Sequence, residues 1–399
     1  MNHDRWIWQS PDWPRLTFDS SGLVGLLAAA RHESGRLLGK AEAIGLEERA
    51  SFEREIWSGE AVATAAIEGE TLDLRAVRSS VARRLGLAHE GPAASRNVEG
   101  LLDVMENAAD AWQSPLTHER LCAWHAALFP GGSLIRRLTV GEYRNEAADP
   151  MQIVSGPVGR ETVHYLAVPG ATVKAEMHAF LEWFDATREG GMDGLLRAGL
   201  AHVWFESIHP FEDGNGRIGR AIIDLALAQD ARRATRLHGV AAAMQRQQDG
   251  YYDALNAAQR GGGDVTPWLD WFLRTYADAC RASIARVDEA LVRARFWSDH
   301  RDTPLNAEQR KVLNRMLEAG PGRFEGGLTP RKYQALTGAT KITASRHIAD
   351  LVAKGVIVRA EGAAGRSTHY NLAIPGWEWT VTPRSSRDPP HTPAPHPRA

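Results

Sequence analysis

The segment HPFEDGNGRIGR, residues 209–220, gathers groups suited to phosphoryl or nucleotidyl transfer. His209 is its one side chain suited to accept a proton at neutral pH. The glycines and the asparagine permit positive φ angles, so backbone N–H groups turn inward and form a cradle for an anion. Arg217 and Arg220, three residues apart on one helical face, are spaced to hold successive phosphates. Asp213 stands beside this anion site, where its charge calls for a bridging cation such as Mg²⁺.

Two helices are predicted to position this segment. Apolar residues recur at helical spacing on both sides of it: Leu196, Leu200, Trp204 and Ile208 before it, and Ile218, Ile222, Leu225 and Ala226 after it. We expect an amphipathic helix, a loop over residues 209–216, and a second helix that begins near Gly216 and adds its unpaired N–H groups to the cradle. The string also contains GxGxxG, but a dinucleotide site of that kind requires a preceding strand, which excludes it here.

The same string resembles, without departure, the signature HPFx(D/E)GNGRxxR of the Fic (filamentation induced by cAMP) family. The resemblance implies a mainly α-helical Fic core and transfer of AMP from ATP-Mg²⁺ to a Tyr, Ser or Thr hydroxyl of a target protein or of the chain itself. It implies that His209 deprotonates this hydroxyl and that Asp213 binds Mg²⁺. The residues implied to bind the nucleotide are Asp213, Gly214, Asn215, Gly216, Arg217, Gly219 and Arg220.

Two other features fit this resemblance. Gly216 is small where the phosphate-transferring, Doc-like branch carries a lysine, so the chain is similar to the AMP-transferring branch. Two β-prone runs, residues 153–157 and 162–168, indicate a hairpin. Relatives carry a β-flap here that pins the target segment by strand addition. A purely structural hairpin is the alternative.

Tyr251 and Tyr252 lie in a segment that resembles the part of the family that encloses adenine and ribose. Both are therefore predicted nucleotide contacts, and core packing is the alternative for either. Gln259 stands about where relatives carry an asparagine, and its role is left open.

The string TAAIEG, residues 64–69, resembles the (S/T)xxxE(G/N) motif of Fic proteins that inhibit themselves. The resemblance implies that the Glu68 carboxylate binds Arg220 in the place that a γ-phosphate needs. A capped or solvated helix turn is the alternative reading of this short motif.

A second, basic unit is expected after the helical core. Residues 306–372 contain eleven Lys or Arg and five Asp or Glu, a net charge of +6. The expected elements follow the order of a winged helix-turn-helix, with helices over 307–317, 330–336 and 342–354 and strands over 356–359 and 367–372. The presumed recognition helix carries Lys341, Thr343, Ser345 and Arg346. DNA and a protein partner remain alternatives.

The 399 residues divide into four expected parts: a Trp-rich and inhibitory-helix region (1–115), the Fic catalytic core (116–300), the winged helix-turn-helix (304–374) and a Pro-rich disordered tail (375–399). A net charge of −2 excludes a protein that is basic throughout. Trp6, Trp8 and Trp13 are expected to pack on the body of the protein.

Two cysteines, Cys122 and Cys280, are too few for a disulfide framework, which favours a reducing compartment. No stretch resembles a membrane span or a signal peptide, so we expect a cytoplasmic protein with no membrane partner. His118, Cys122 and His125 share a helical face, but no fourth ligand is apparent, which argues against zinc.

The leading hypothesis is a self-inhibited protein adenylyltransferase that uses ATP and Mg²⁺ and acts on a protein hydroxyl. Removal of AMP at the same site, with Glu68 orienting an attacking water, is the alternative within this fold. A DNA-binding regulator with a nucleotide-sensing Fic core is the alternative from another class. A homodimer is left open, and the target protein is unidentified.

Overall fold

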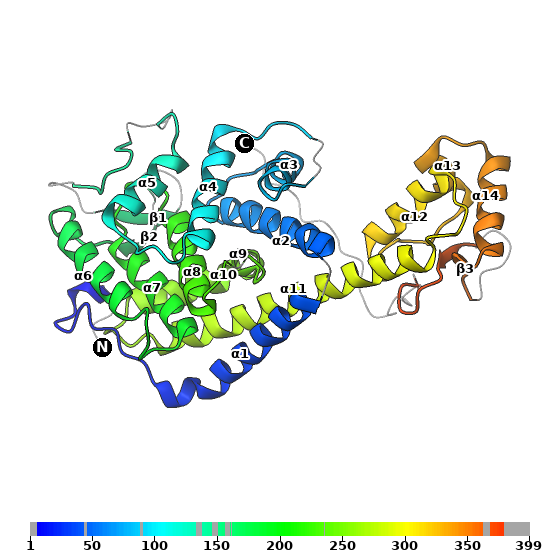
Figure 1. Cartoon of the computed structure of the whole chain (residues 1–399). Helices are drawn as coiled ribbons and strands as arrows, with labels where there is room; N and C mark the ends of the chain where they lie inside the picture. The colour runs from blue at the N-terminus through cyan, green and yellow to red at the C-terminus, as the bar shows by residue number, and fades with distance from the viewer. Residues whose placement is uncertain are drawn as a thin grey trace. The chain divides into compact units, whose positions relative to one another are not determined.

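The computed structural model describes residues 6–43, 46–87, 91–132, 138–145, 151–155, 160, 162–234, 236–361 and 368–378. The chain divides into two compact units, residues 1–288 and 289–399 (Figure 1). Among the helices of the described ranges, none combines the length and the apolar character needed to cross a membrane.

The first unit is mainly α-helical, as predicted. Its elements are η1 (Ile7–Gln9), α1 (Ser20–Ala43), α2 (Leu46–Ile67), α3 (Leu74–Arg84), α4 (Arg96–Asp110), α5 (His118–Leu128), β1 (Gln152–Ser155), β2 (Thr162–Leu166), η2 (Gly170–Thr172), α6 (Val173–Ala186), α7 (Gly194–Ile208), α8 (Asn215–Ala231), α9 (Val240–Arg246), α10 (Gln248–Gln259) and the first part of α11 (Thr266–Asp299), whose residues from Glu289 on belong to the second unit.

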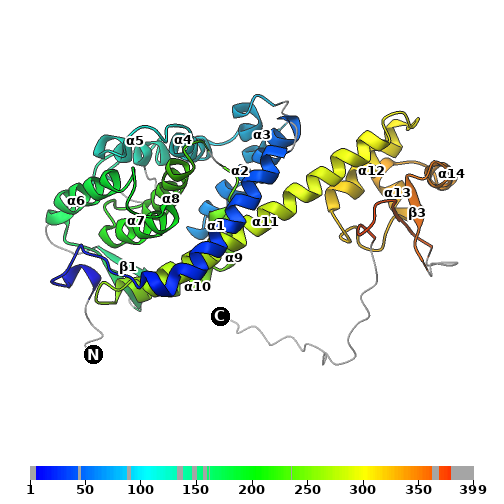
Figure 2. The ribbon, with the colours of Figure 1, turned by 60° about the horizontal axis from the view of Figure 1, so that its bottom comes forward.

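Helices α7 and α8 form the centre of this unit. Every residue of α7 is buried, as are most residues of α8. A helix buried on all sides needs neighbours on all sides, and α2, α4, α5, α6 and α10 surround the pair (Figures 1 and 2). The expectation of an amphipathic helix before residue 209 is therefore wrong, because α7 has no face left for solvent.

The predicted hairpin is present as an antiparallel pair, β1 and β2, with Gln152 opposite Leu166. A bulge interrupts the register between Ile153 and Val154. Residues 156–159 and 161 of the connecting turn lie outside the described residues. The side chain of Trp8 donates to the Leu166 carbonyl oxygen at 2.7 Å.

The rest of the N-terminal tryptophan segment also packs on this unit, as predicted. The Trp6 ring meets Tyr165 edge-on with centroids 5.4 Å apart. Trp13 donates to the Glu176 carboxylate at 2.8 Å. These contacts fix the segment beside the hairpin and α6.

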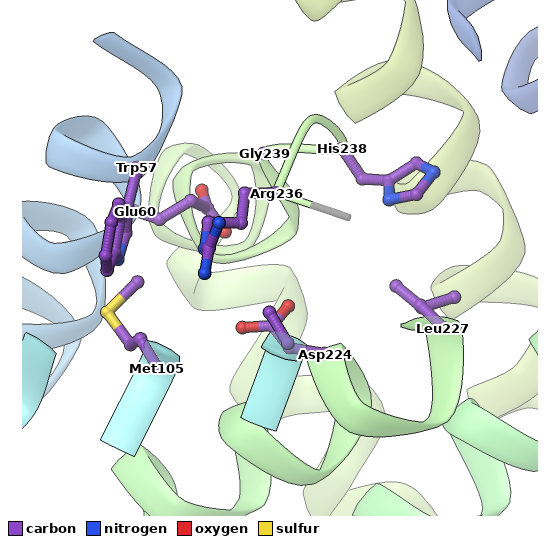
Figure 3. A pocket seen from close by; sticks show the side chains of 9 residues that line it. Trp57, Glu60, Met105, Asp224, Leu227, Arg236, His238 and Gly239 are labelled. Carbon is purple, nitrogen blue, oxygen red and sulfur yellow. The ribbon is translucent and has the colours of Figure 1, made fainter. Parts of the chain in front are cut away.

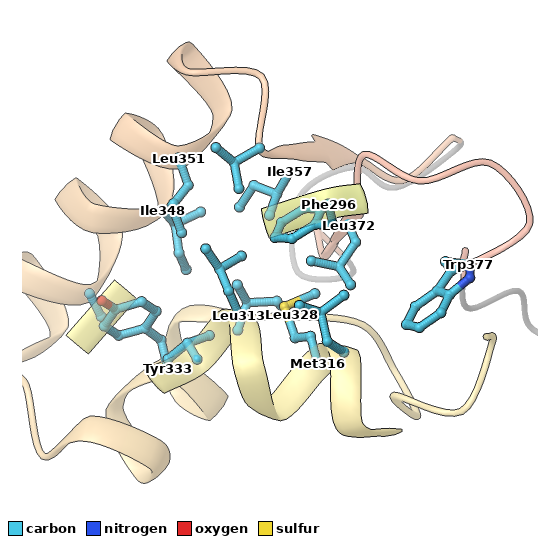
Figure 4. Close-up of a cluster of buried hydrophobic side chains, with 14 residues drawn as sticks. Phe296, Leu313, Met316, Leu328, Tyr333, Ile348, Leu351, Ile357, Leu372 and Trp377 are labelled. Carbon is cyan, nitrogen blue, oxygen red and sulfur yellow. The ribbon is translucent and has the colours of Figure 1, made fainter. Parts of the chain in front are cut away.

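The second unit has the element order of a winged helix-turn-helix, with α12 (Ala307–Ala319), α13 (Pro330–Thr337), α14 (Lys341–Ala353) and the antiparallel strands β3 (Ile357–Arg359) and β4 (Tyr370–Leu372). Thr329 and Thr340 cap the N-termini of α13 and α14. The core of this unit is a cluster of buried apolar side chains from all of these elements (Figure 4).

Two expected boundaries differ from those of the structure. Phe296 near the end of α11 belongs to the second unit's core, and that unit begins at Glu289 rather than near residue 304. Trp377 lies in the predicted tail but is buried in the same core (Figure 4). The remainder of that tail, residues 379–399, lies outside the described residues.

Candidate active site

The loop over residues 209–214 depends on two left-handed residues. His209 ends α7 with φ 52° and ψ 62°, and its N–H donates to the Phe205 carbonyl at 2.9 Å. Gly214 precedes α8 with φ 79°, where a Cβ would lie 3.0 Å from the Phe129 ring. A side chain at 214 would thus meet both backbone strain and a steric contact. Helix α8 begins at Asn215, one residue before the predicted start.

Asn215 shapes this loop with its side chain. Its Oδ1 accepts from the Phe211 N–H at 2.9 Å, and its Nδ2 donates to the Phe211 carbonyl at 2.8 Å. The side chain is buried. While the Asn215 side chain is held in this way, only its backbone N–H at the start of α8 can contact a nucleotide.

His125 supports the loop from α5. Its Nδ1 accepts from the Gly141 N–H at 2.9 Å, so its Nε2–H is the donor to the Asp213 carbonyl at 3.2 Å. Burial lowers the pKa of this imidazole to about 4, so it is neutral at physiological pH. Both ring nitrogens are engaged in this way, and no group of three potential metal ligands occurs within the described parts of the chain. Sequence reasoning missed this structural role.

His209 is partly accessible and paired with a buried acid. Its Nδ1 lies 3.5 Å from Glu206 Oε2, and its side chain is 15% exposed. Burial opposes ionisation of Glu206, but its hydrogen bond to His209 and the neighbouring His202 and Arg220 lower its pKa overall. An ionised Glu206 at Nδ1 leaves Nε2 as the nitrogen that can accept a proton. The acid three residues before His209 was a signal that the sequence analysis did not use.

Gly219 permits close packing of α7 against α8. A Cβ there would lie 2.6 Å from Glu206 Oε1 and 3.1 Å from the His202 ring. The glycine lets α7 bring its carboxylate against α8.

Arg220 is buried and held by the end of α2. Its Nη2 donates to Glu68 Oε1 at 2.7 Å and to the Thr64 carbonyl at 3.0 Å, and its Nε donates to Thr64 Oγ1. Burial opposes the charge, but Glu68 raises the pKa of Arg220 overall. Thr64 and Glu68 stand one helical turn apart and therefore reach the same guanidinium.

The turn that follows α2 explains the glycine of the upstream motif. The Gly69 N–H donates to the Ala66 carbonyl at 3.0 Å, and the Glu70 N–H donates to the Ala65 carbonyl at 2.9 Å. Gly69 has φ 77°. This is the Schellman arrangement, in which a left-handed residue reverses the chain at a helix end. It presents Glu68 and Glu70 together.

Glu70 is a second carboxylate at the site. Its Oε1 accepts from Arg217 Nη1 at 2.9 Å. Arg217 also approaches Asp213 Oδ1 at 3.4 Å and stacks over the Phe129 ring. The guanidinium groups of both motif arginines thus face carboxylates from residues 68–70. The upstream motif, residues 64–69, predicted a role for Glu68 only, because Glu70 lies one residue beyond the motif.

Gly216 leaves room for this arrangement. A Cβ at residue 216 would lie 2.3 Å from Glu68 Oε1. The Glu68 carboxylate therefore sits against the backbone of the first turn of α8, where unpaired N–H groups and the helix dipole favour negative charge. In this conformation a carboxylate stands beside the cradle that the sequence assigned to phosphate.

The adjacent tyrosines 251 and 252 point to different sides of α10, as predicted for neighbouring residues on a helix. Tyr251 is buried, and its hydroxyl lies 2.9 Å from His202 Nε2, so it belongs to the core here. Tyr252 is 40% exposed, and its hydroxyl donates to the Ile67 carbonyl at 3.1 Å. It thereby contacts the residue before Glu68. Gln259 is buried.

A small cavity lies farther along the contact of α2 and α8. Glu60, Asp224 and Arg236 line it (Figure 3). Glu60 lies one helical turn before Thr64 on α2, and Asp224 lies one turn after Arg220 on α8. Its volume of about 20 Å³ has room for about one water molecule. Glu60 caps α9 by accepting from the Ala241 and Ala242 N–H groups, each at 2.8 Å. The cavity is too small for a nucleotide.

Two family models match parts of this chain. Residues 115–227 match the Fic/DOC family, and residues 6–87 match a domain of unknown function, DUF4172. "Protein adenylyltransferase fic-1" of Caenorhabditis briggsae is 27% identical over 173 residues, 42% of this chain and 31% of that protein. The matched segment thus spans about a third of the length of that relative.

A crystal structure of a Fic family protein from Desulfovibrio desulfuricans G20 is similar in fold, with a TM-score of 0.52 and 23% identity. The match covers 90% of this chain and 98% of that one. Fic-1 (residues 134–508) from C. elegans matches with a TM-score of 0.45 and 18% identity, covering 67% of this chain and 75% of that one.

Proposed function

We propose that the chain is a self-inhibited protein adenylyltransferase. The premise is the match of residues 115–227 to the Fic/DOC family, preceded by the match of residues 6–87 to DUF4172. It transfers AMP from ATP to a Tyr, Ser or Thr hydroxyl of a target protein or of itself. The observation that carries the proposal is the Glu68 carboxylate, paired with Arg220 and seated against Gly216, on the same loop and helix that carry the partly accessible His209. A built anion site next to a base suits transfer of a phosphate ester.

The chemistry follows from the chain's own groups. His209 Nε2 accepts the proton of the target hydroxyl, whose oxygen attacks the α-phosphorus. The bond from this phosphorus to the β-phosphate oxygen breaks, so pyrophosphate leaves and AMP remains on the target. The N–H groups at the start of α8 and the two arginines hold the phosphates and stabilise charge in the transition state.

Asp213 fits a role as the Mg²⁺ ligand. Its carboxylate is about half exposed, lies beside Arg217 at the edge of the cradle, and offers the hard oxygen donor that Mg²⁺ prefers. Mg²⁺ in that place would offset the negative charge of the phosphates.

The inhibition is a competition for the arginines. While Glu68 holds Arg220 and Glu70 holds Arg217, ATP must compete with a carboxylate for each guanidinium. The end of α2 must therefore move, or its carboxylates must be displaced, before the outer phosphates bind productively.

Labelling with ATP carrying a radioactive α-phosphate tests the proposal. The full chain with Glu68→Gly, Mg²⁺ and a cell lysate should yield covalently labelled protein, and adding His209→Ala should remove the label. A chain that binds ATP but labels nothing, itself included, would contradict it. If the Glu68-bearing protein instead releases AMP from a prelabelled target, the reverse reaction is the activity of this site.

A second function, DNA binding, is favoured by the exposed face of α14. Ile342 is 83% exposed, and Lys341, Ser345 and Arg346 are exposed beside it. Within the described ranges, no acidic side chain pairs with Lys341 or Arg346. The first turns of this helix are those that enter the major groove in such folds. Thr343, by contrast, is half-buried and engaged with the cap at Thr340.

Fluorescence anisotropy with a labelled duplex tests this second function. Lys341→Ala with Arg346→Ala should weaken binding and flatten its dependence on salt. Lys354→Ala is the matched control, because Lys354 is paired with Asp350. Equal affinity of wild type and the double variant would refute a DNA contact at this face.

A further inference from the structure

Arg144 is a buried arginine that binds the backbone of the catalytic loop. Its Nε donates to the His209 carbonyl at 2.7 Å, and its Nη2 donates to the carbonyls of Ile208 at 3.1 Å and Val168 at 2.6 Å. Its own N–H donates to the Pro210 carbonyl at 2.9 Å. One residue therefore meets three successive carbonyls at the point where α7 becomes the loop.

These carbonyls need a partner from outside the helix. The last carbonyls of a helix lack intrahelical donors, and buried ones are costly when left unpaired. His209 in addition holds a left-handed conformation, which is unfavourable for a non-glycine residue unless surrounding contacts fix it. The Arg144 guanidinium supplies N–H donors to the carbonyls of Ile208 and His209 and so fixes the left-handed conformation of His209.

Arg144 does not act alone in this segment. Thr139 Oγ1 donates to a Glu212 carboxylate oxygen at 3.0 Å, and Gly141 fixes the ring of His125, which donates to Asp213. Residues 138–145 thus lie along the loop from its first carbonyl to its metal-binding end. Arg144 makes the contacts nearest to the proposed base.

The Val168 contact brings the hairpin into the same set of hydrogen bonds. Val168 follows β2 by two residues, and its carbonyl shares the Nη2 donor with the end of α7. The hairpin, which the family resemblance suggests as the flap that holds the target segment, and the histidine proposed to deprotonate that segment's hydroxyl are therefore both tied to one guanidinium.

We propose that Arg144 is a positioning residue for the transfer reaction, which fixes the backbone of His209 and couples it to the β1–β2 hairpin. This inference rests on the proposed function. Arg144 contacts no reacting group itself. It determines where the imidazole stands relative to a hydroxyl presented by the hairpin, and it leaves the arginine and backbone contacts of ATP intact.

The test compares Arg144→Lys and Arg144→Gln in the full chain carrying Glu68→Gly. Arg197→Lys is the matched control, because Arg197 is also buried and donates to a backbone carbonyl, that of Phe184, away from this loop. We expect the kcat of AMP transfer to fall about 100-fold in Arg144→Gln and less in Arg144→Lys, since small displacements of a reacting group can cost this much. KM for ATP should stay within about threefold, because the ATP contacts are kept.

A second readout does not need AMP transfer. The imidazole ¹⁵N chemical shifts of His209, assigned by their loss in His209→Ala, should change in Arg144→Lys and stay the same in Arg197→Lys. If no variant labels any protein, the proposed function fails while these shifts still test Arg144. Unchanged shifts would overturn the inference, as would an equal loss of kcat in Arg197→Lys or a parallel rise in KM for ATP.

Discussion

Replacing Glu68 with glycine is expected to raise both ATP affinity and the rate of AMP transfer. The carboxylate lies 2.7 Å from Arg220 Nη2, the guanidinium is 5% exposed and the carboxylate 27% exposed. A hydrogen bond to a charged group in such a place contributes about 1.5–3 kcal/mol. Loss of this competitor should therefore tighten ATP binding by about 10- to 100-fold.

Glu70 should matter less than Glu68. Its carboxylate is 45% exposed, so its pair with Arg217 is screened by solvent and contributes about 0–1 kcal/mol. Glu70→Gln alone should raise ATP affinity less than about fivefold. Combined with Glu68→Gly, the gain in binding free energy should fall short of the sum of the two single gains if both carboxylates hold one turn closed, because a turn that Glu68→Gly has already opened has little left to gain.

Calorimetric titration with ATP-Mg²⁺ and the initial rate of self-labelling measure both effects. Glu68→Gln is the control that keeps the size of the side chain and removes its charge, so it should follow Glu68→Gly in affinity. Thr64 still accepts hydrogen bonds from Arg220 in these variants, so without ATP we expect the free energy of unfolding to fall by no more than the lost charged pair contributes, about 1.5–3 kcal/mol. Arg220→Ala should show no gain, because it deletes a phosphate contact along with the inhibitory one. A Glu68→Gly protein that binds and labels no better than wild type would refute inhibition by this turn.

The remaining predictions concern the base, the metal and Asp224, a partly buried acid beside the small cavity. His209→Ala should lower transfer by about 10²–10⁴-fold and leave ATP binding nearly unchanged, as measured by labelling and titration. Asp213→Ala should leave weak transfer that added Mg²⁺ restores only in part; an unaltered Mg²⁺ dependence would exclude it as the ligand. Burial and the nearby Glu60 charge raise the pKa of Asp224 well above its ordinary value, so its contribution to stability is present at acidic pH and lost as pH rises through the raised pKa. Asp224→Asn should therefore gain stability over wild type at pH 8 relative to pH 5 in urea unfolding, and an equal difference at both pH values would contradict this.

The sequence allowed prediction of features set by local spacing. The loop at 209–216, the hairpin, and the helices of the second unit follow from periodicity, turn residues and caps, which act within a few residues. Trp377 and the end of α11 were assigned to the wrong parts because their burial depends on partners elsewhere in the chain. Tyr251 and Tyr252 could be placed on different sides of a helix, but only the fold decides which side is core.

The residues that support the site could not be predicted from the sequence for a related reason. Arg144, Glu70 and His125 each bind the loop or its arginines across 65 to 147 positions of sequence. No short motif records such a pairing. The need for these partners is visible only in the structure, where His209 takes a left-handed conformation at a helix end and requires donors that its own helix cannot provide.

Under the proposed function, Gly216 connects inhibition to phosphate binding. Its missing side chain leaves the first turn of α8 open to an anion, and Glu68 Oε1 uses that opening at a point only 2.3 Å from where a Cβ would be. The same small residue that gives a phosphate access to the backbone N–H groups thus gives a carboxylate access to them. A larger residue at 216 would displace the Glu68 carboxylate and would also leave less room for a phosphate in the cradle. Relief of inhibition with retained activity must therefore come from the α2 side of the contact, where Ile67 is held by Tyr252 and Gln248 of α10.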